Sequence, residues 1–257
     1  GYDWKEVKRF KKLDQKDRSI VFYLEKEFDF IFFKPVVEKL TQEYDTKICY
    51  VTSSKTDPML SCNDKNIQPF YIGDGVARSN FFINLKATII VMTMPDLETF
   101  HIKRSKVYPV HYVYIFHSLN STQRAYTNTA FDNFDTIFCT GNYQIIEIQE
   151  RERKFNLNKK KLVKHGYGRL DTLINEARST DIRKSASNNK VVLIAPSWGA
   201  NGLIETKGQE IVSILLDSGF DVILRPHPMT IKKSNKVLQK ILLRQLQLKF
   251  CLPRFLD

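Results

Sequence analysis

Three short motifs carry side chains suited to proton transfer and to anion binding. His117 directly follows residues 111–116 (HYVYIF), a strand-like run of apolar and aromatic residues. An imidazole at such a position can act as a general base at neutral pH, because its ordinary pKa of about 6.5 leaves it largely unprotonated. The alternative is a capping or structural histidine, and the residues alone leave both interpretations open.

Residues 225–228 (RPHP) form the second motif, which ends the strand-like run at residues 221–224. Two prolines remove backbone donors and restrict the chain, so this segment should leave the sheet and present Arg225 and His227 rigidly at its edge. A guanidinium fork beside an imidazole donor suits a pyrophosphate. The alternative is a simple turn.

The third motif is residues 195–199 (APSWG), again at the end of a strand-like run. Ser197 and the backbone N–H groups of this loop can meet a phosphate, although the next helix is expected near Gly208, too far along the chain for a P-loop. No dinucleotide-binding glycine fingerprint occurs. The five histidines and four cysteines never fall at zinc-ligand spacing, so neither a metal nor a cofactor is expected.

These motifs follow strands that alternate with helices, a pattern that predicts parallel sheets with a ligand crevice at the carboxyl ends of the strands. In the first expected helix, which has Pro35 near its start, Val36, Val37, Leu40 and Tyr44 should share one face. The expected strands are residues 19–24, 47–52, 68–72, 87–92, 111–116, 136–139 and 161–165, followed by 191–195 and 221–224. Further helices are expected at about 143–155, 171–184, 208–217 and 232–248.

A domain boundary is expected near residues 185–190 (SASNNK), which are small and polar as in a loop. Residues 1–184 then form one Rossmann-like domain with a linker helix, and residues 185–257 form a partial second one. The second has only about half of the strands that such a domain normally needs, so it is expected to be truncated. The predicted fold class is α/β, with two Rossmann-type parallel sheets.

The formal charge of the chain is +12 at neutral pH, and it is unevenly distributed. Residues 151–184 carry eleven basic and four acidic side chains, and residues 232–254 carry seven basic and none acidic. Such runs either attract phosphates, of a nucleotide, a polyanionic polymer, nucleic acid or an anionic membrane, or are solvated helix faces. No known nucleic-acid-binding pattern interleaves them with aromatic residues, so no nucleic-acid partner is expected.

The cysteines and the apolar runs indicate where the protein resides. Cys49, Cys62, Cys139 and Cys251 show no paired spacing, which is typical of buried thiols in a reducing compartment. No run approaches the roughly 20 apolar residues of a membrane-spanning helix, and no signal peptide is visible. We therefore expect a soluble protein of the cytoplasm.

Taken in order, the strand-end motifs resemble the CDP-glycerol glycerophosphotransferase family, the teichoic-acid-type polymerases and primases with a GT-B fold. The matching stretches are HYVYIFHSL, KHGYGRLDTL, APSW and RPHP, and the likeness extends over residues 19–230. Two positions differ, because Gly168 replaces the usual proline and Ser118 the usual glycine. The family's later serine- and aspartate-rich donor-binding segment has no counterpart here.

The resemblance implies transfer of a glycerol-phosphate-type unit from CDP-glycerol, or a similar CDP-polyol, to a cell-surface polymer, with release of CMP. The acceptor would be a polyol phosphate or lipid-linked, and the enzyme would lie at the inner face of the plasma membrane against its anionic surface. The first domain would be the acceptor side and the second would bind the donor. His117 falls at the position of the family's catalytic base, with Ser197, Arg225, His227, Ser118 and Arg169 as substrate-binding candidates.

Two alternatives stay open at this point. One is a GT-B hexosyltransferase that uses a nucleotide sugar, which a screen of CDP-polyol and UDP-sugar donors would separate from the first reading. The other is an inactive truncated remnant that binds anionic polymer or membrane through its basic runs. For either enzyme, we expect His117 and His227 to face one cleft.

Overall fold

A computed structural model describes residues 1–179, 189–243 and 249–250 of the chain. The chain forms two compact units, Gly1–Thr180 and Asp181–Asp257. The boundary expected after Lys184 lies outside the described residues, as does most of the expected loop at 185–190.

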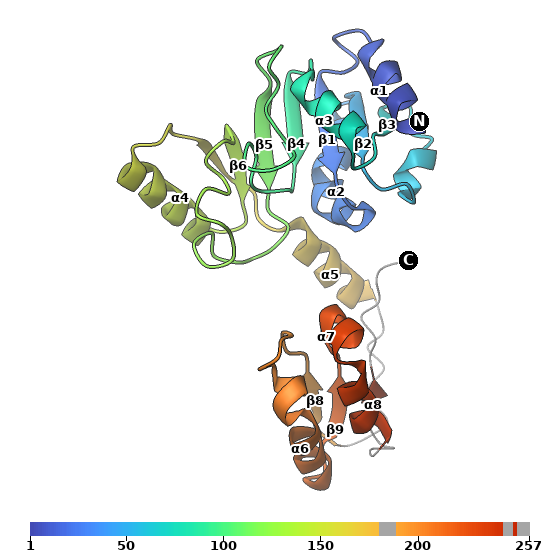
Figure 1. The fold of residues 1–257 in the computed structure, drawn as a ribbon, viewed down its shortest axis with the longest axis vertical. Helices are drawn as coiled ribbons and strands as arrows, with labels where there is room; N and C mark the ends of the chain where they lie inside the picture. The colour runs from blue at the N-terminus through green and yellow to red at the C-terminus, as the bar shows by residue number, and fades with distance from the viewer. Residues whose placement is uncertain (180–188, 244–248, 251–257) are drawn as a thin grey trace. The chain divides into compact units, whose positions relative to one another are not determined.

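The first unit is built on a parallel sheet of seven strands in the order β3-β2-β1-β4-β5-β6-β7 (Figure 1). The strand order reverses between β1 and β4, which makes their carboxyl ends the switch point where such sheets bind ligands. Every strand expected here from the sequence forms, with ends shifted by two residues at most. The strands are β1 (Ile20–Leu24), β2 (Ile48–Thr52), β3 (Ile67–Tyr71), β4 (Ile89–Met92), β5 (His111–Ile115), β6 (Thr136–Cys139) and β7 (Lys161–Lys164).

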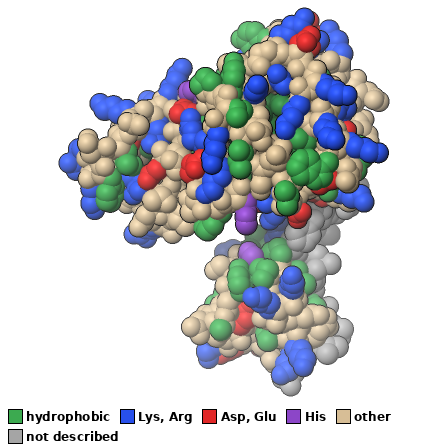
Figure 2. Space-filling model, turned by 45° about the horizontal axis from the view of Figure 1, so that its top comes forward, with side chains coloured by type: hydrophobic (Ala, Val, Ile, Leu, Met, Phe, Trp, Pro, Cys, Tyr) green, Lys and Arg blue, Asp and Glu red, His purple; other side chains and the backbone are tan. Residues whose placement is uncertain are grey.

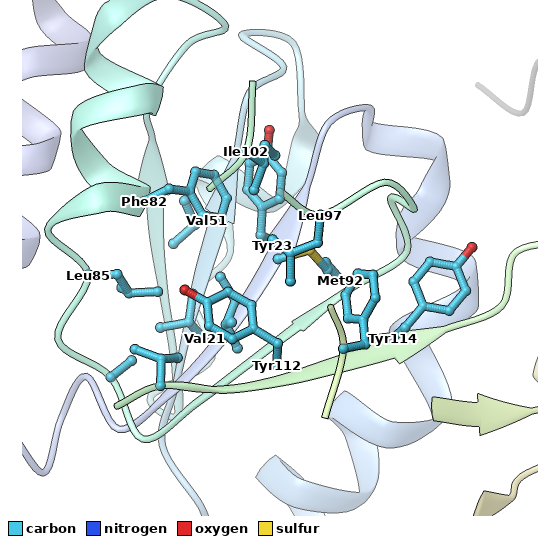
Figure 3. Close-up of a cluster of buried hydrophobic side chains, with 14 of the residues drawn as sticks. Val21, Tyr23, Val51, Phe82, Leu85, Met92, Leu97, Ile102, Tyr112 and Tyr114 are labelled. Carbon is cyan, nitrogen blue, oxygen red and sulfur yellow. The ribbon is translucent and has the colours of Figure 1, made fainter. Parts of the chain in front are cut away.

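Helices cover both faces of this sheet, so alternate strand residues enter two different cores. In β1, Val21 and Tyr23 point to the face covered by α1 (Tyr2–Lys11) and α3 (Val76–Ile83). Figure 3 shows Tyr23 and Phe82 of α3 packed in this core, with ring centroids 4.8 Å apart. Each such side chain contributes about 1.5–3 kcal/mol by its burial. The helices α1 and α3 were not expected from the sequence.

The opposite core lies under α2 (Phe30–Glu38), which α5 (Gly168–Ser179) contacts on the same side of the sheet. Phe22 and Leu24, which alternate with Val21 and Tyr23 along β1, belong to this second core. The helix α4 (Asn142–Phe155) instead contributes Ile148 to the core beneath α1 and α3. The unit therefore has three layers.

The expectation for α2 is partly wrong. Pro35 lies inside the helix rather than near its start, and the helix continues as a wider π-helical turn at Lys39–Glu43. Because a π-helical turn holds more residues than an α-helical turn, the residues after it rotate off the expected face. Tyr44 ends this turn and is 65% exposed, whereas Val37 is fully buried as expected.

The second unit has three parallel strands in the order β10-β9-β8. Apolar residues of α6 and α8 cover one face of β8 and β9, while the opposite face leaves Val191 and Leu193 exposed. The elements are β8 (Val191–Ile194), α6 (Leu203–Asp217), β9 (Asp221–Leu224), α7 (Pro228–Lys233), α8 (Asn235–Leu243) and β10 (Lys249–Phe250).

Two expected helices in this unit need correction. The helix expected from Gly208 begins earlier, at Leu203. Gly208 lies inside this helix, where a larger side chain would press on Ile241 of α8. The helix expected across residues 232–248 is interrupted at Ser234, whose non-helical backbone (φ -124°, ψ 26°) separates α7 from α8. Residues 244–248 lie outside the described part of the chain.

Two of the cysteines fit the expectation of buried thiols. Burial raises the pKa of Cys49 and of Cys139 to about 12. Cys62 is only partly buried, because it follows the short 3-10 helix Pro58–Ser61 at the surface. Cys251 lies outside the described residues. Within the described ranges, no helix combines the length and apolarity needed to cross a bilayer.

Candidate functional site

The carboxyl ends of three neighbouring strands meet around His117. Glu25 directly follows β1, Thr93 directly follows β4, and His117 comes two residues after the end of β5. All three residues line a pocket of about 270 Å³ at the switch point of the sheet. The rest of the lining comes from Tyr23, Lys26, Phe28, Asp29, Met94 and Pro95.

The imidazole of His117 is held in one tautomer. Its Nδ1 lies 3.1 Å from the backbone oxygen of Thr93. A carbonyl oxygen can only accept a hydrogen bond, so Nδ1 carries the proton and Nε2 keeps a free lone pair. The hydroxyl of Tyr114, 3.3 Å from the same nitrogen, can be a second acceptor.

The surroundings of His117 also keep its ring neutral. Burial lowers its pKa below 6.5, Lys26 lowers it further, and the hydrogen bond to Thr93 opposes this in part. Because a lowered pKa leaves the imidazole unprotonated at pH 7, Nε2 is able to accept a proton from a bound hydroxyl group.

Aromatic side chains fix the position of this ring. Phe32 of α2 and Tyr126 meet the imidazole at edge-type angles, each with a centroid separation of 6.1 Å. Tyr167 stacks on Phe32 and donates a hydrogen bond from its hydroxyl to the backbone oxygen of His117, at 3.1 Å. Sequence reasoning missed Tyr167, because the stretch KHGYGRLDTL was considered only for its family resemblance and for its glycines.

Asp29 is a second titratable group in the pocket, and sequence reasoning missed it too. It precedes α2 and lines the pocket together with His117. Burial raises its pKa from 3.8 to about 6, with Lys26 opposing and Glu25 and Glu27 adding to the rise. The available signal was a single acidic residue between two phenylalanines shortly after a strand.

Two expected substrate-binding residues lie near His117 but outside the lining of this pocket. The hydroxyl of Ser118 is 2.7 Å from that of Tyr126, which occupies it within the protein. Arg169 is the second residue of α5, and its charge lowers the pKa of Tyr167, against the larger effect of burial. Their roles in binding substrate stay predictions.

In the second unit, the APSW and RPHP motifs come together. The indole of Trp198 stacks on the imidazole of His227, with centroids 6.1 Å apart and planes 28° apart. Lys233, in the last turn of α7, places its ammonium group 4.9 Å from the centre of the Trp198 ring. The cluster joins the loops that follow β8 and β9, which are adjacent strands.

His227 is held in the tautomer opposite to that of His117. Its Nδ1 accepts a hydrogen bond from the backbone N–H of Met229 at 3.1 Å, which caps α7. Nδ1 therefore bears the lone pair, and Nε2 carries the proton of the neutral ring. A neutral His227 is a hydrogen-bond donor at Nε2, as binding to a phosphate oxygen requires.

Ser197 and Arg225 project from the same strand ends. Both are exposed, and neither side chain forms a hydrogen bond or ion pair within the described ranges. The backbone N–H of Arg225 donates to Ile194 at the end of β8, which brings the two motifs close together. Although α6 begins soon after the APSW loop, the side chain of Glu205 fills the space beside Gly202, the residue that caps the N-terminus of this helix.

His117 and His227 belong to different units, so the common cleft expected for them stays a prediction. A larger pocket of about 500 Å³ lies along α4, and no candidate residue lines it. Its charges are largely paired within the protein, for example Arg151 with Asp132 at 2.7 Å. Among the described residues, no group of three acidic, histidine or cysteine side chains is placed to hold a metal ion.

The sequence matches no protein-family model and no curated protein. The structure resembles the wall teichoic acid polymerase TagF with CDPG, at a TM-score of 0.50 and 16% identity, over 91% of this chain and 62% of the polymerase. It also resembles MnaA of S. aureus with UDP, at a TM-score of 0.59 and 14% identity, over 92% of this chain and 68% of that protein.

A third similar structure is the UDP-GlcNAc 2-epimerase of Neisseria meningitidis bound to UDP-GlcNAc. It aligns with a TM-score of 0.54 and 14% identity, over 92% of this chain and 72% of the epimerase. At such identities the likeness establishes the fold alone. The predicted fold class is thereby confirmed as α/β of the GT-B type. The chain spans 62% of the length of the TagF structure.

Proposed function

We propose that this chain is a GT-B-type transferase that moves a glycerol-phosphate-type unit from CDP-glycerol, or a similar CDP-polyol, to a hydroxyl group of a cell-surface polymer. The observation that carries the proposal is the pair of opposite tautomers. His117 offers a lone pair at Nε2, and His227 offers a proton at Nε2. The first suits a general base, and the second suits a donor to phosphate oxygens.

The proposed reaction uses these groups in turn. Nε2 of His117 takes the proton of the acceptor hydroxyl group as its oxygen bonds to the β-phosphorus. The bond between that phosphorus and the bridging oxygen breaks, and CMP leaves with the electron pair. Arg225, His227 and Ser197 stabilise the charge that develops on the phosphates, which is expected to be the dominant catalytic effect in phosphoryl-type transfers.

Three further points support this function without deciding the donor. The motifs resemble those of glycerophosphotransferases, both clusters lie at strand ends, and the similar structures include complexes with CDPG, UDP and UDP-GlcNAc. Because the chain covers 62% of TagF, the activity of the whole protein is part of the proposal. So are the acceptor, a polyol phosphate or a lipid-linked chain, and the assignment of residues 1–184 to the acceptor and 185–257 to the donor.

A donor screen tests the proposal. Purified protein is incubated with a glycerol-phosphate polymer and, in separate reactions, CDP-glycerol, CDP-ribitol or UDP-GlcNAc, and nucleotide release is measured by chromatography. We expect CMP from a CDP-polyol and no UDP. Release of UDP instead would favour the hexosyltransferase alternative, and the absence of nucleotide binding together with polymer binding would favour the inactive remnant.

We also propose a peripheral location at the cytoplasmic face of the plasma membrane. Lysine and arginine side chains are spread over the face of the larger unit that Figure 2 shows. Lys5 and Lys8 of α1 and Lys12, which caps its C-terminus, are exposed on the side away from the core, and Trp4 of the same helix is 37% exposed. Basic residues beside an exposed indole suit an anionic lipid surface.

A further inference from the structure

The pocket around His117 has a charge balance unlike that of the whole chain. The protein carries a formal charge of +12, yet Glu25 and Asp29 line this pocket with a single cation, Lys26. An adjoining pocket of about 330 Å³ shares Glu25 and adds one carboxylate, Asp96, and one guanidinium, Arg78. Carboxylates therefore outnumber fixed cations in the region where the proposed acceptor group must enter.

The two cations do little to make the pocket attractive to a phosphate. Arg78 is buried, and its Nη1 donates to Oε1 of Glu25 at 3.0 Å, so these two charges offset each other and leave Asp29 and Asp96 against Lys26. Lys26 is exposed, and its Nζ lies 5.6 Å from the centre of the Phe28 ring. No cation among the described residues comes within ion-pair distance of the Asp29 carboxylate, which would repel an anion placed beside it.

Thr93 supplies an independent sign of a ligand. Its side chain is 5% exposed and lines the pocket, and its hydroxyl group has no hydrogen-bond partner within the described part of the chain. Buried hydroxyl groups are normally paired, because leaving one unpaired costs about 1–3 kcal/mol. A bound hydroxyl group, which both donates and accepts, would satisfy Thr93 and a neighbouring carboxylate together.

The size and the apolar part of the pocket narrow the ligand further. A volume of about 270 Å³ is just below the ~300–1,000 Å³ of typical small-molecule pockets, so one small unit fits rather than a chain. Phe28 lines the same pocket and is 52% exposed, which leaves its ring available to the carbon skeleton of a ligand. Carboxylates, a hydroxyl group and an open aromatic ring together suit a sugar or polyol.

We propose that the group that enters the His117 pocket is an uncharged sugar or polyol unit. Its hydroxyl groups donate to Asp29 and Glu25 and pair with Thr93, its carbon atoms lie against Phe28, and any phosphate of the acceptor stays outside. The acceptor thus enters with its hydroxyl end first. This inference rests on the proposed function only where it identifies the bound group as the acceptor, whose hydroxyl group His117 deprotonates.

Ligand-observed NMR on the whole chain at pH 7.5 tests this proposal without turnover. Glycerol and methyl glucoside are the neutral probes, and glycerol 3-phosphate is the charged one. We expect at least one neutral probe to bind about tenfold or more tightly than glycerol 3-phosphate. Asp29→Asn should lower the affinity for the neutral probe by about tenfold, the loss expected for a hydrogen bond to a charged group. It should also reduce the preference for the neutral probe over glycerol 3-phosphate.

Two further variants keep the test decisive. Phe28→Ser changes an exposed side chain, so the protein should still fold, while binding of the neutral probe should be lost. Glu210→Gln removes an exposed carboxylate of the second unit and should leave the binding of the neutral and the charged probes unchanged. Tighter binding of glycerol 3-phosphate than of both neutral probes, binding that is insensitive to Asp29 and Phe28, or no binding of any probe would overturn the proposal.

The donor screen separates this inference from the proposed function. Selective binding of a neutral probe through Asp29 without nucleotide release would uphold the pocket and reject the transferase. CMP release with a pocket that prefers glycerol 3-phosphate would uphold the transferase and reject the inference.

Discussion

At the scale of single residues, the backbone decides what each histidine can do. The Thr93 carbonyl group makes Nε2 of His117 an acceptor, and the Met229 N–H group makes Nε2 of His227 a donor. Two identical side chains thereby obtain different proposed roles, as base and as phosphate ligand. Substitutions of the two residues should consequently have different kinetic signatures.

His117→Ala should lower turnover by about 10²- to 10⁴-fold while nucleotide binding changes little, because a general base acts mainly in the transition state. The rate of the unchanged enzyme should fall in acid, and only below pH 6.5, since burial lowers the pKa of His117. With acceptor at saturating concentration, so that protonation of Asp29 does not limit acceptor binding, this acidic limb should vanish in the variant. The measurement is CMP release against pH.

His227→Ala should weaken nucleotide binding, slow the reaction and retain the acidic limb, because His227 is assigned to the donor phosphates. Isothermal titration with CDP-glycerol gives the binding part. For His117→Ala, in contrast, near-normal CMP release with an unchanged fall of the rate in acid would mean that another residue is the base.

Asp29→Asn should stabilise the protein at neutral pH. The pKa of Asp29 is about 6 in the folded protein and 3.8 when the residue is exposed. Between these two pH values, the folded state therefore binds more protons than the unfolded state. Stability therefore falls as pH rises through this window, and the full cost is present above pH 6. This rise in the pKa of Asp29 corresponds to at most about 3 kcal/mol of the free energy of unfolding. Denaturant unfolding should show the variant as more stable at pH 7.5, and the gain should disappear near pH 3.5; a gain of equal size at both pH values would contradict this origin.

At the scale of elements, the contact between α2 and α5 holds the aromatic residues around His117. Phe32 belongs to α2, and Tyr167 directly precedes α5. A side chain on Gly168 would lie 2.6 Å from Cγ of Pro35, whose ring has no freedom to move aside. The absence of a side chain at Gly168 thus allows α5 to approach α2.

Gly168→Ala should therefore destabilise the first unit by about 1–3 kcal/mol, the usual cost of overpacking. Thermal unfolding measures the loss, and Pro35→Ala in the same chain should recover much of it by removing the clash. Gly75→Ala is the matched control, since nothing lies within 4 Å of the added atom. Equal losses in the two glycine variants would show that packing against Pro35 is not the cause.

At the scale of the whole molecule, the net charge should act as a long-range attraction to anionic surfaces. The excess of basic residues is spread over exposed positions, while the pocket at His117 is comparatively rich in carboxylates. The protein can accordingly be attracted to a polyanion or a membrane without drawing phosphates into that pocket. Added salt should weaken the surface attraction more than the exclusion of phosphates from the pocket, because salt screens exposed charges more strongly than buried ones.

We expect binding to vesicles that contain anionic lipid, and weak binding to neutral ones. The attraction should decline as the screening length falls from about 10 Å at 0.1 M salt to about 3 Å at 1 M. Replacing Lys5 and Lys8 of α1 and its C-cap residue Lys12 with glutamate should abolish sedimentation with anionic vesicles. Equal binding to neutral vesicles would count against the membrane proposal.

A matched charge reversal locates the surface. Lys159, Lys161 and Lys164 are also exposed, and their change to glutamate alters the net charge by the same amount. This variant should retain most of the vesicle binding if the face of α1 makes the contact. A similar loss in both variants would mean that net charge alone governs the attraction.

The amino-acid sequence by itself determined the parallel sheets and the place of His117, Ser197, Arg225 and His227 at strand ends, because apolar runs and proline act locally. The tertiary structure alone decided what surrounds them. Tautomers depend on the partner that each ring meets, and for His117 that partner lies 24 residues away, directly after an adjacent strand. Asp29, Thr93 and Tyr167 join His117 only because β1, β4 and β5 are neighbours and α5 packs on α2. No local pattern records such proximity, since it arises from the order of strands in the folded sheet.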